Sequence, residues 1–429
     1  MIIEFNIGNF RSIKDIQTFN MTAANIVSKY KEIDDTNLIK VSDKLSLLKS
    51  KGVYGANASG KSNLVRGLVA FIAIVNRSVK DEKILAEMID PFRLSVTSEN
   101  EPTYFQLSFL LDKIYYRYGF EASESKIHSE WLFGTPGKRE VPFFTRINDK
   151  IEINESQFKE GASFSNLYSK GNNDIARENS LFLTTIKALN GALSKKIVDY
   201  ISSITVISGL GDKRLHSIAG DSLKDEKTRA LIIDLLKITD TGIDNVVRVE
   251  FTKENLPKDA PIELLSEIEN NKKFSIILTE HKRYNKDLKR ANTVAFLMAS
   301  QESEGSKKMF EISPFIIKAL ETKSPIVIDE FDARFHPLLT KKLIELFNSK
   351  TNTGAQFIFI THDTNLLRAN LLRRDQICFV EKDKYGGSHF YTLADFKGIR
   401  NDASFEKDYI SGKYGAIPFL GDFSSIIED

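Results

Sequence analysis

The segment "KGVYGANASGKSNLVRGLVAFIAIVNRSV", residues 51–79, contains an apolar run, a glycine-rich turn and a second apolar run. The turn "GANASGKS" fits the pattern G-x-x-x-x-G-K-[ST] between a predicted strand and a predicted helix. In that context the backbone N–H groups of the turn and the positive end of the helix surround a phosphate. We therefore expect an α/β fold with a nucleotide-binding loop formed by Gly55, Ala56, Asn57, Ala58, Ser59, Gly60, Lys61, Ser62 and Asn63.

A second segment, "SPIVIDEFDARFHP" (324–337), ends an apolar run on two adjacent carboxylates. Two acids at the edge of a core are costly unless a positive charge lies beside them. We expect Asp329 to hold Mg²⁺ together with Ser62, and Glu330 to orient and deprotonate the attacking water. In "QFIFITHD" (356–363) the next predicted strand ends near His362, which can hydrogen-bond the γ-phosphate or the water. The expected catalytic residues are therefore Glu330, His362 and Lys61.

The segment "ESEGSKK" (302–308) precedes a helix expected to begin near Lys307. There Ser303 and Gly305 can offer a hydroxyl and backbone N–H groups to a γ-phosphate, or Ser303 can simply cap the helix. At "HP" (336–337) a helix is expected to begin, because proline suits the first turn of a helix.

Composition indicates a folded chain of ordinary type. The 429 residues exceed the size at which single cores stop growing, so two lobes are expected. The 60 Lys and Arg nearly balance the 58 Asp and Glu, so the net charge of +2 gives no global argument for nucleic acid. The single cysteine, Cys378, suits a reducing compartment and is expected in a buried strand. Neither a signal peptide nor a membrane-spanning segment is indicated, so we expect a cytoplasmic protein without a membrane anchor.

The pattern along the chain indicates an ATPase-type core split by a long insertion. "IIEFNIGNF" predicts a strand, and "TYFQLSFLLDKIYYRYGFEA" predicts a hairpin or meander. The middle region predicts helices at "KALNGALSKKIVDYISSI", "KTRALIIDLLKI" and "PIELLSEIE", then a strand at "KFSIILTEH". Afterwards strands and helices alternate, with helices at "PFIIKALE", "PLLTKKLIELFNS" and "TNLLRANLL" and strands at "SPIVIDE", "AQFIFITH" and "DQICFVEKD". The expected domains are 1–150 with the phosphate loop and a β lobe, 151–290 as a mixed, mainly helical insertion, and 291–429 as the second half of the core.

Together, "GANASGKSN", "SEGSKK", "VIDEFDARFHP" and "ITHD" resemble the Walker A, signature, Walker B with D-loop, and switch-histidine motifs of ABC-type ATPases of the SMC/RecF/OLD branch. "NFRSI", "YRYGFE" and the region from "LRRDQICFVEKD" onward resemble RloA/AbiL-type anti-phage ATPases over nearly the whole chain. The signature lacks the second glycine of the LSGGQ pattern. Gln106 is a candidate for the Q-loop glutamine.

The resemblance implies several properties of the chain. Phe10 and Arg11 would lie near the nucleotide, and Ser303, Gly305 and Asp332 of one subunit would complete the ATP site of another. The partners would be a homodimer or higher oligomer with composite ATP sites and a separately encoded effector, a TOPRIM-like nuclease. The chain itself is expected to lack that nuclease domain.

Two other readings stay open. A RecF- or SMC-like ATPase would use the same motifs to clamp DNA in repair, with a basic saddle and strongly salt-dependent duplex binding. A scaffold would use ATP only to hold an oligomer together, and would be unaffected by Glu330→Gln.

Overall fold

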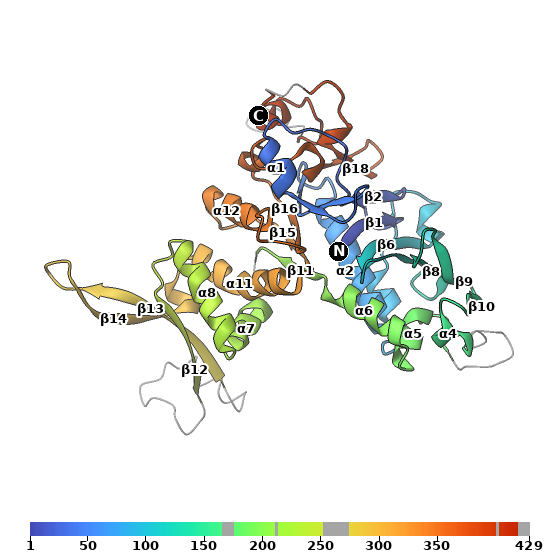
Figure 1. The fold of residues 1–429 in the computed structure, drawn as a ribbon, viewed down its shortest axis with the longest axis horizontal. Coiled ribbons are helices and arrows are strands. Elements are labelled where there is room, and N and C mark those ends of the chain that lie inside the picture. Colours follow the sequence, from blue (N-terminus) through green and yellow to red (C-terminus); the bar gives the residue numbers. More distant parts are fainter. Residues whose placement is uncertain (165–175, 211–212, 252–273, 400–402, 419–429) are drawn as a thin grey trace, which may run out of the picture. The chain divides into compact units, whose positions relative to one another are not determined.

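The structure is a computed structural model that describes residues 1–164, 176–210, 213–251, 274–399 and 403–418. It divides into two compact units, which we describe separately (Figure 1). Unit 1 comprises Met1–Ile207, Thr322–Phe331 and Lys341–Asp429, and unit 2 comprises Ser208–Glu321 and Asp332–Thr340. Among the described residues, no helix combines the length and the apolar character needed to cross a bilayer.

A six-stranded sheet forms the centre of unit 1, in the order β11-β15-β16-β5-β17-β18. Strands β15, β16, β5 and β17 are parallel, and β18 is antiparallel to β17. Nearly every residue of the four parallel strands is buried, as expected for strands covered on both faces. The strands are β5 (Ser50–Tyr54), β11 (Thr205–Ser208), β15 (Pro325–Asp329), β16 (Gln356–Ile360), β17 (Ile377–Lys382) and β18 (Ser388–Thr392).

A seven-stranded antiparallel sheet, in the order β10-β9-β8-β7-β6-β1-β2, forms the β lobe of unit 1. It confirms the predicted opening strand and the predicted meander, which continues to β10. Helix α2 (Lys61–Arg77) contacts both sheets, through β1 and β15, and its Phe71 ring lies 5.6 Å from that of Phe120. The strands are β1 (Ile2–Gly8), β2 (Gln17–Asn20), β6 (Thr103–Leu111), β7 (Ile114–Ala122), β8 (Ile127–Thr135), β9 (Val141–Ile147) and β10 (Lys150–Ile153).

Short elements complete unit 1. The segment predicted as one helix, "KALNGALSKKIVDYISSI", belongs to two helices that break at Asn190, which has a φ of +67°. The other elements are α1 (Lys31–Thr36), β3 (Leu38–Lys40), β4 (Ser46–Leu48), α3 (Ile84–Met88), η1 (Ser98–Asn100), α4 (Lys159–Ala162), α5 (Phe182–Ala188), α6 (Ala192–Ser203), η2 (Thr364–Leu366), η3 (Arg374–Gln376), η4 (Leu393–Asp395) and α13 (Phe405–Ile410).

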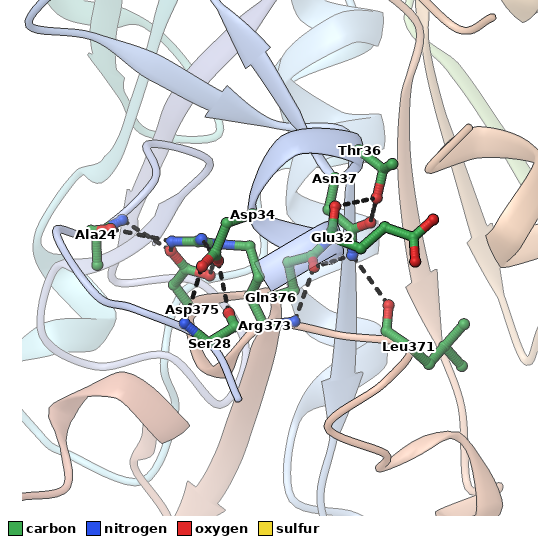
Figure 2. A network of polar contacts seen from close by, with 10 residues as sticks. All are labelled: Ala24, Ser28, Glu32, Asp34, Thr36, Asn37, Leu371, Arg373, Asp375 and Gln376. Carbon is green, nitrogen blue, oxygen red and sulfur yellow. Dashed lines mark hydrogen bonds and ion pairs between the residues drawn. The ribbon is translucent and has the colours of Figure 1, made fainter. Parts of the chain in front are cut away.

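A buried polar network joins the N-terminal segment to the residues before β17 (Figure 2). The Arg373 guanidinium donates to both carboxylate oxygens of Asp375, at 3.0 and 2.9 Å, and also pairs with Asp34 of α1. Asn37 donates to the side chain of Gln376 at 2.8 Å, and Gln376 donates to the carbonyl oxygen of Ser50 in β5. The network therefore supports the strand that leads into the phosphate loop.

Unit 2 contains helices and a three-stranded antiparallel sheet in the order β12-β13-β14. Its elements are α7 (Lys213–Ser222), α8 (Glu226–Ile238), β12 (Asn245–Phe251), β13 (Phe274–Tyr284), β14 (Arg290–Leu297), α10 (Met298–Gln301) and α11 (Glu304–Thr322). Helix α12 (Pro337–Phe347) begins in unit 2 and continues in unit 1.

Some sequence predictions need correction or extension. The expected helix at "TNLLRANLL" is wrong, because the segment forms only the 3-10 turn η2, where the Asp363 side chain accepts a hydrogen bond from the Asn365 backbone. The predicted helix at "KTRALIIDLLKI" corresponds to α8, and the strand at "KFSIILTEH" to β13, but the pattern did not indicate β12 or β14. The segment "PIELLSEIE" lies outside the described residues.

Candidate phosphate-binding site

A cavity of about 450 Å³ lies where the parallel strands of unit 1 end. The loop after β5, the acids at the end of β15, the histidine after β16 and the last residue of β17 all reach it, because neighbouring parallel strands end at the same edge. The residues lining it are Asn57, Ala58, Ser59, Gly60, Lys61, Ser62, Asn63, Arg66, Asp329, Glu330, Ile360, His362 and Lys382. The structure thus brings together on one cavity most of the predicted loop residues, both predicted acids and the predicted histidine.

The glycine-rich loop is held from behind by two serines that the sequence patterns did not indicate. Gly60 has a φ of +109°, and a Cβ atom there would collide with the hydroxyls of Ser12 and Ser388. Ser388 donates to the carbonyl oxygen of Ser59 at 2.6 Å, and its hydroxyl accepts a hydrogen bond from the Ser12 hydroxyl at 2.7 Å. Asn63 also donates to the Ser12 hydroxyl, at 2.7 Å. The loop conformation therefore depends on the segment after β1 and on β18.

Donors in the loop suit an anionic ligand. The Lys61 ammonium donates to the backbone carbonyls of Gly55 and Ala56, at 2.7 and 2.8 Å, which keeps it over the loop. Within the described residues, the buried hydroxyl of Ser59 has no hydrogen-bond partner. A buried hydroxyl without a partner is costly, and a phosphate oxygen would satisfy it. The loop also leads into α2 at Lys61, so the positive end of that helix faces the cavity.

The two acids differ in their surroundings. Asp329 is the last residue of β15 and its carboxylate accepts a hydrogen bond from the Glu330 backbone at 3.0 Å. Glu330 itself has a φ of +51°, an uncommon conformation for a residue other than glycine. Phe331 then returns to the core, donating its N–H to Ile360 of β16 at 2.9 Å. The backbone is thus fixed on both sides of Glu330, whose side chain lines the cavity.

Other predicted residues have different surroundings. Phe10 is buried, and the Arg11 side chain pairs with Asp90 at 3.3 Å. Gln106 lies in β6 and accepts hydrogen bonds from Trp131 and Arg117.

The sequence patterns did not indicate two basic residues of the cavity, Arg66 and Lys382. The position of Lys382 could have been predicted from the sequence, because it lies at the end of a predicted strand that belongs to the same parallel sheet. Arg66 was identifiable only as one turn beyond Ser62 in the helix.

The signature and D-loop residues form a second cluster, in unit 2. Ser303 caps α11, accepting a hydrogen bond from the Ser306 N–H at 3.1 Å, so the helix begins at Glu304 rather than near Lys307. Arg334 pairs with Glu304 at 2.8 Å, and the buried Lys308 donates to the carbonyl oxygen of Ala333 at 2.6 Å. The D-loop from Asp332 to Phe335 is therefore attached to the first turns of the signature helix. The exposed His336 accepts from the N–H of Leu338 at the start of α12.

Two features of the chain define its class: a glycine-rich loop between β5 and α2, and acids at the end of a neighbouring parallel strand. These are the features of a P-loop nucleotide-binding protein. Residues 52–368 match the family model described as "AAA domain, putative AbiEii toxin, Type IV TA system". The chain belongs to this family. No curated protein matches the chain.

Among solved structures, the chain is similar to an SMC head bound to the C-winged helix domain of ScpA, with a TM-score of 0.44 and 12% identity over 91% of this chain and 97% of that one. It is also similar to the SMC head domain from Thermotoga maritima, with a TM-score of 0.42 and 11% identity over 91% and 98%. A third is the Smc head domain with an extended coiled coil from Pyrococcus furiosus, bound to the C-terminal domain of ScpA, with a TM-score of 0.40 and 12% identity over 96% and 98%.

Proposed function

We propose that the chain binds ATP with Mg²⁺ in the cavity at the strand ends and hydrolyses it to ADP and phosphate. The observation that carries this proposal is the meeting of the glycine-rich loop, Asp329, Glu330 and His362 on one cavity. The donor set fits both ligands: loop N–H groups, Lys61 and the unpartnered Ser59 hydroxyl for phosphates, and the oxygens of Ser62 and Asp329 for Mg²⁺. Bound Mg²⁺ would neutralise charge on the phosphates.

The residues of the chain have distinct roles in this reaction. Lys61 leaves its loop carbonyls to bind the terminal phosphates, and the loop N–H groups position them. Glu330 accepts a proton from the water that attacks the γ-phosphorus, while the bond from that phosphorus to the ADP oxygen breaks. His362 hydrogen-bonds the γ-phosphate or the attacking water. The positive φ of Glu330 is consistent with this role, since strained backbone often occurs at functional residues.

The test of the reaction is Glu330→Gln, which keeps the shape of the side chain but removes the base. We expect the ATP turnover rate to fall about 100-fold or more, with ATP binding retained. Lys61→Ala should instead weaken nucleotide binding. Turnover would be measured by phosphate release and binding by a fluorescent ATP analogue. Glu345→Gln, a surface carboxylate of α12, is the matched control. A Glu330→Gln protein with wild-type turnover would contradict the assignment and favour a scaffold.

The ATP sites are proposed to be composite. The residues that line the cavity belong to unit 1, whereas Ser303, Gly305 and Asp332 belong to unit 2. In the proposed dimer the signature cluster of one subunit faces the cavity of the other. The attachment of the D-loop to the signature helix supports this, because both segments would then move as one surface. Glu330→Gln protein should accordingly accumulate as a nucleotide-bound dimer.

The cellular role that we propose is a switch in anti-phage abortive infection that controls a separately encoded effector, such as a nuclease. The family description, which names a toxin and a toxin–antitoxin system, supports this setting. Opening and closing on ATP can act only by changing the binding of another molecule.

To test this role, we would assay the purified chain on DNA and RNA and co-express it with the product of the neighbouring gene. We expect toxicity only on co-expression, with no cleavage by the chain alone. Metal-dependent cleavage that is lost when Glu381 and Asp383 are changed would contradict the proposal. In the structure, the Glu381 carboxylate accepts from Tyr391, and the Asp383 carboxylate accepts from backbone N–H groups of the β17–β18 turn.

A further inference from the structure

The β13–β14 hairpin of unit 2 continues beyond its third strand. Strand β12 pairs with β13 only from Phe274 to Glu280, whereas β14 pairs with β13 up to Tyr284. From His281 onward the hairpin is therefore a two-stranded ribbon, seen in yellow in Figure 1 where it extends away from β12. Among the described residues, those from 282 to 290 are all exposed, and two strands alone bury little apolar surface. Packing against the described part of the chain therefore does not account for the length of this ribbon.

The ribbon carries a concentrated positive charge. Residues 282–290, "KRYNKDLKR", include five Lys or Arg residues and one Asp, and all nine are exposed. By comparison, the entire chain of 429 residues has a net charge of +2. The local charge thus exceeds that of the whole chain, so an electrostatic partner would be drawn to this hairpin rather than to the protein in general.

The basic residues lie on both faces of the ribbon. Successive residues of a strand point to opposite faces, so Lys282 and Arg283 lie on different faces, opposite Thr293 and Asn292. Within the described residues, the ion pairs of the ribbon involve His281, which pairs with Glu302, and Lys282 and Arg290, which pair with Asp244 at 3.2 and 3.7 Å; none involves the two lysines of the turn, Lys286 and Lys289. Charge toward the tip is therefore available to a ligand.

The tip is preformed rather than loose. The Asn285 side chain accepts hydrogen bonds from the N–H groups of Asp287 and Lys289, at 3.0 and 2.9 Å, and Leu288 adopts a φ of +60°. The backbone that carries Lys286 and Lys289 is thereby held in a defined turn. Tyr284 and Leu288 are 54% and 82% exposed, which places apolar groups among the charges. Such preorganisation lowers the entropy cost of binding.

We propose that this β-ribbon, residues 281–294, binds duplex nucleic acid by entering its groove. A two-stranded ribbon fits the major groove of DNA, which is about 12 Å wide. Basic residues on both faces would contact the phosphates of both strands, and Tyr284 and Leu288 would meet base or sugar surfaces. An acidic protein could satisfy the charge as well, but the two-faced arrangement on a narrow ribbon favours a groove. The proposal does not rest on ATP hydrolysis.

The experiment is fluorescence anisotropy of a labelled 30-base-pair DNA with the full chain, without nucleotide, at several salt concentrations. The test variant is Lys286→Glu with Lys289→Glu. We expect affinity near 0.1 M salt to fall by about tenfold or more, and the slope of log affinity against log salt to decrease by about two. The matched control reverses Lys138 and Arg139, two exposed basic residues at the β8–β9 turn. It should bind the DNA like the wild type.

Three results would overturn the proposal: the ribbon variant binding as tightly as wild type, the control losing as much affinity, or the wild type binding polyglutamate but not the duplex. Thermal melting of both variants checks that they are folded. The ATPase assay is run without DNA, and we expect the ribbon variant to turn over ATP at the wild-type rate. The two assays therefore test DNA binding and ATP hydrolysis independently. A chain without ATPase activity that still binds DNA through the ribbon would contradict the reaction alone.

Discussion

At the scale of single residues, the backbone of Glu330 shows how the fold sets the direction of a side chain that lines the cavity. A positive φ in a residue with a Cβ atom costs about 1 kcal/mol or more, so the surroundings must enforce it. The enforcing contacts are the hydrogen bond from the Glu330 N–H to Asp329 and the one from the Phe331 N–H to Ile360. Through them, the sheet that carries the cavity also fixes the direction in which Glu330 leaves the strand.

Cys378 provides a residue-scale prediction, because it is the one cysteine of the chain. It is buried in β17, as the sequence indicated, and burial raises the pKa of its thiol to about 11. Only the thiolate reacts with disulfide reagents, so we expect the native protein to react very slowly with Ellman's reagent at pH 8. The protein unfolded in urea should release one equivalent of the coloured thiolate from the reagent. The unfolded Cys378→Ala variant should release none.

The same shift predicts a pH dependence of folding. The pKa is higher in the folded protein than the ordinary value of 9.0, so the folded state keeps a proton that the unfolded state loses. The contribution of the thiol to stability is therefore complete below pH 9 and is lost as the pH rises toward 11. Fast stoichiometric labelling of Cys378 in the native protein at pH 8 would contradict both the expected slow reaction and the raised pKa on which the pH dependence rests.

At the scale of elements, the network around Arg373 predicts a large effect on stability. The Arg373 side chain is 2% exposed and faces the carboxylates of Asp34 and Asp375. Removing a buried partner leaves uncompensated charges, which typically costs about 3–5 kcal/mol. We expect Arg373→Ala to lower the free energy of unfolding by about that amount, measured by urea denaturation.

The neighbouring Arg374→Ala is the control for that measurement. Arg374 is half-buried, and its replacement should change the free energy of unfolding by less than about 1 kcal/mol. Equal effects of the two substitutions would show that the network in Figure 2 does not carry the stability of this region.

Elements also show which features could be predicted from sequence. The loop at Gly55–Ser62, the strand ending at Asp329 and the strand before His362 were predictable, because each motif is continuous in the chain and the ends of parallel strands must meet. Strand β14 was not, because its first residues are exposed and polar and it is a strand only through pairing with β13. The Arg373–Asp34 pair joins residues 339 positions apart, and no local pattern records such a contact.

At the scale of the whole molecule, the composite-site proposal separates two functions along one chain. The phosphate cavity is built from the two ends of the sequence, residues of the loop near Gly60 and of the strands near Asp329 and His362. The signature cluster is built from the region between, joined to the D-loop by the Lys308–Ala333 hydrogen bond. A change in either part should therefore leave the other intact, which makes the proposal testable by mixing damaged subunits.

The prediction uses Lys61→Ala, which damages the cavity, and Gly305→Asp, which damages the signature. A Cβ atom at Gly305 would lie 3.0 Å from the carbonyl oxygen of Arg334, so the added carboxylate must crowd the D-loop. Each variant alone should be nearly inactive in ATP turnover. After mixing, a symmetric dimer would leave one intact site in each mixed pair, restoring roughly a quarter of the wild-type rate.

The control for this mixing experiment is a chain that carries both substitutions, mixed with the Lys61→Ala protein. No pair in that mixture contains an intact cavity, so turnover should stay at the level of the single variants. Native mass spectrometry would establish that mixed pairs form. A composite site must be restored when the undamaged cavity of one subunit meets the undamaged signature of the other. If mixed pairs form but the mixture of Lys61→Ala and Gly305→Asp proteins recovers no turnover, each ATP site is complete within one chain.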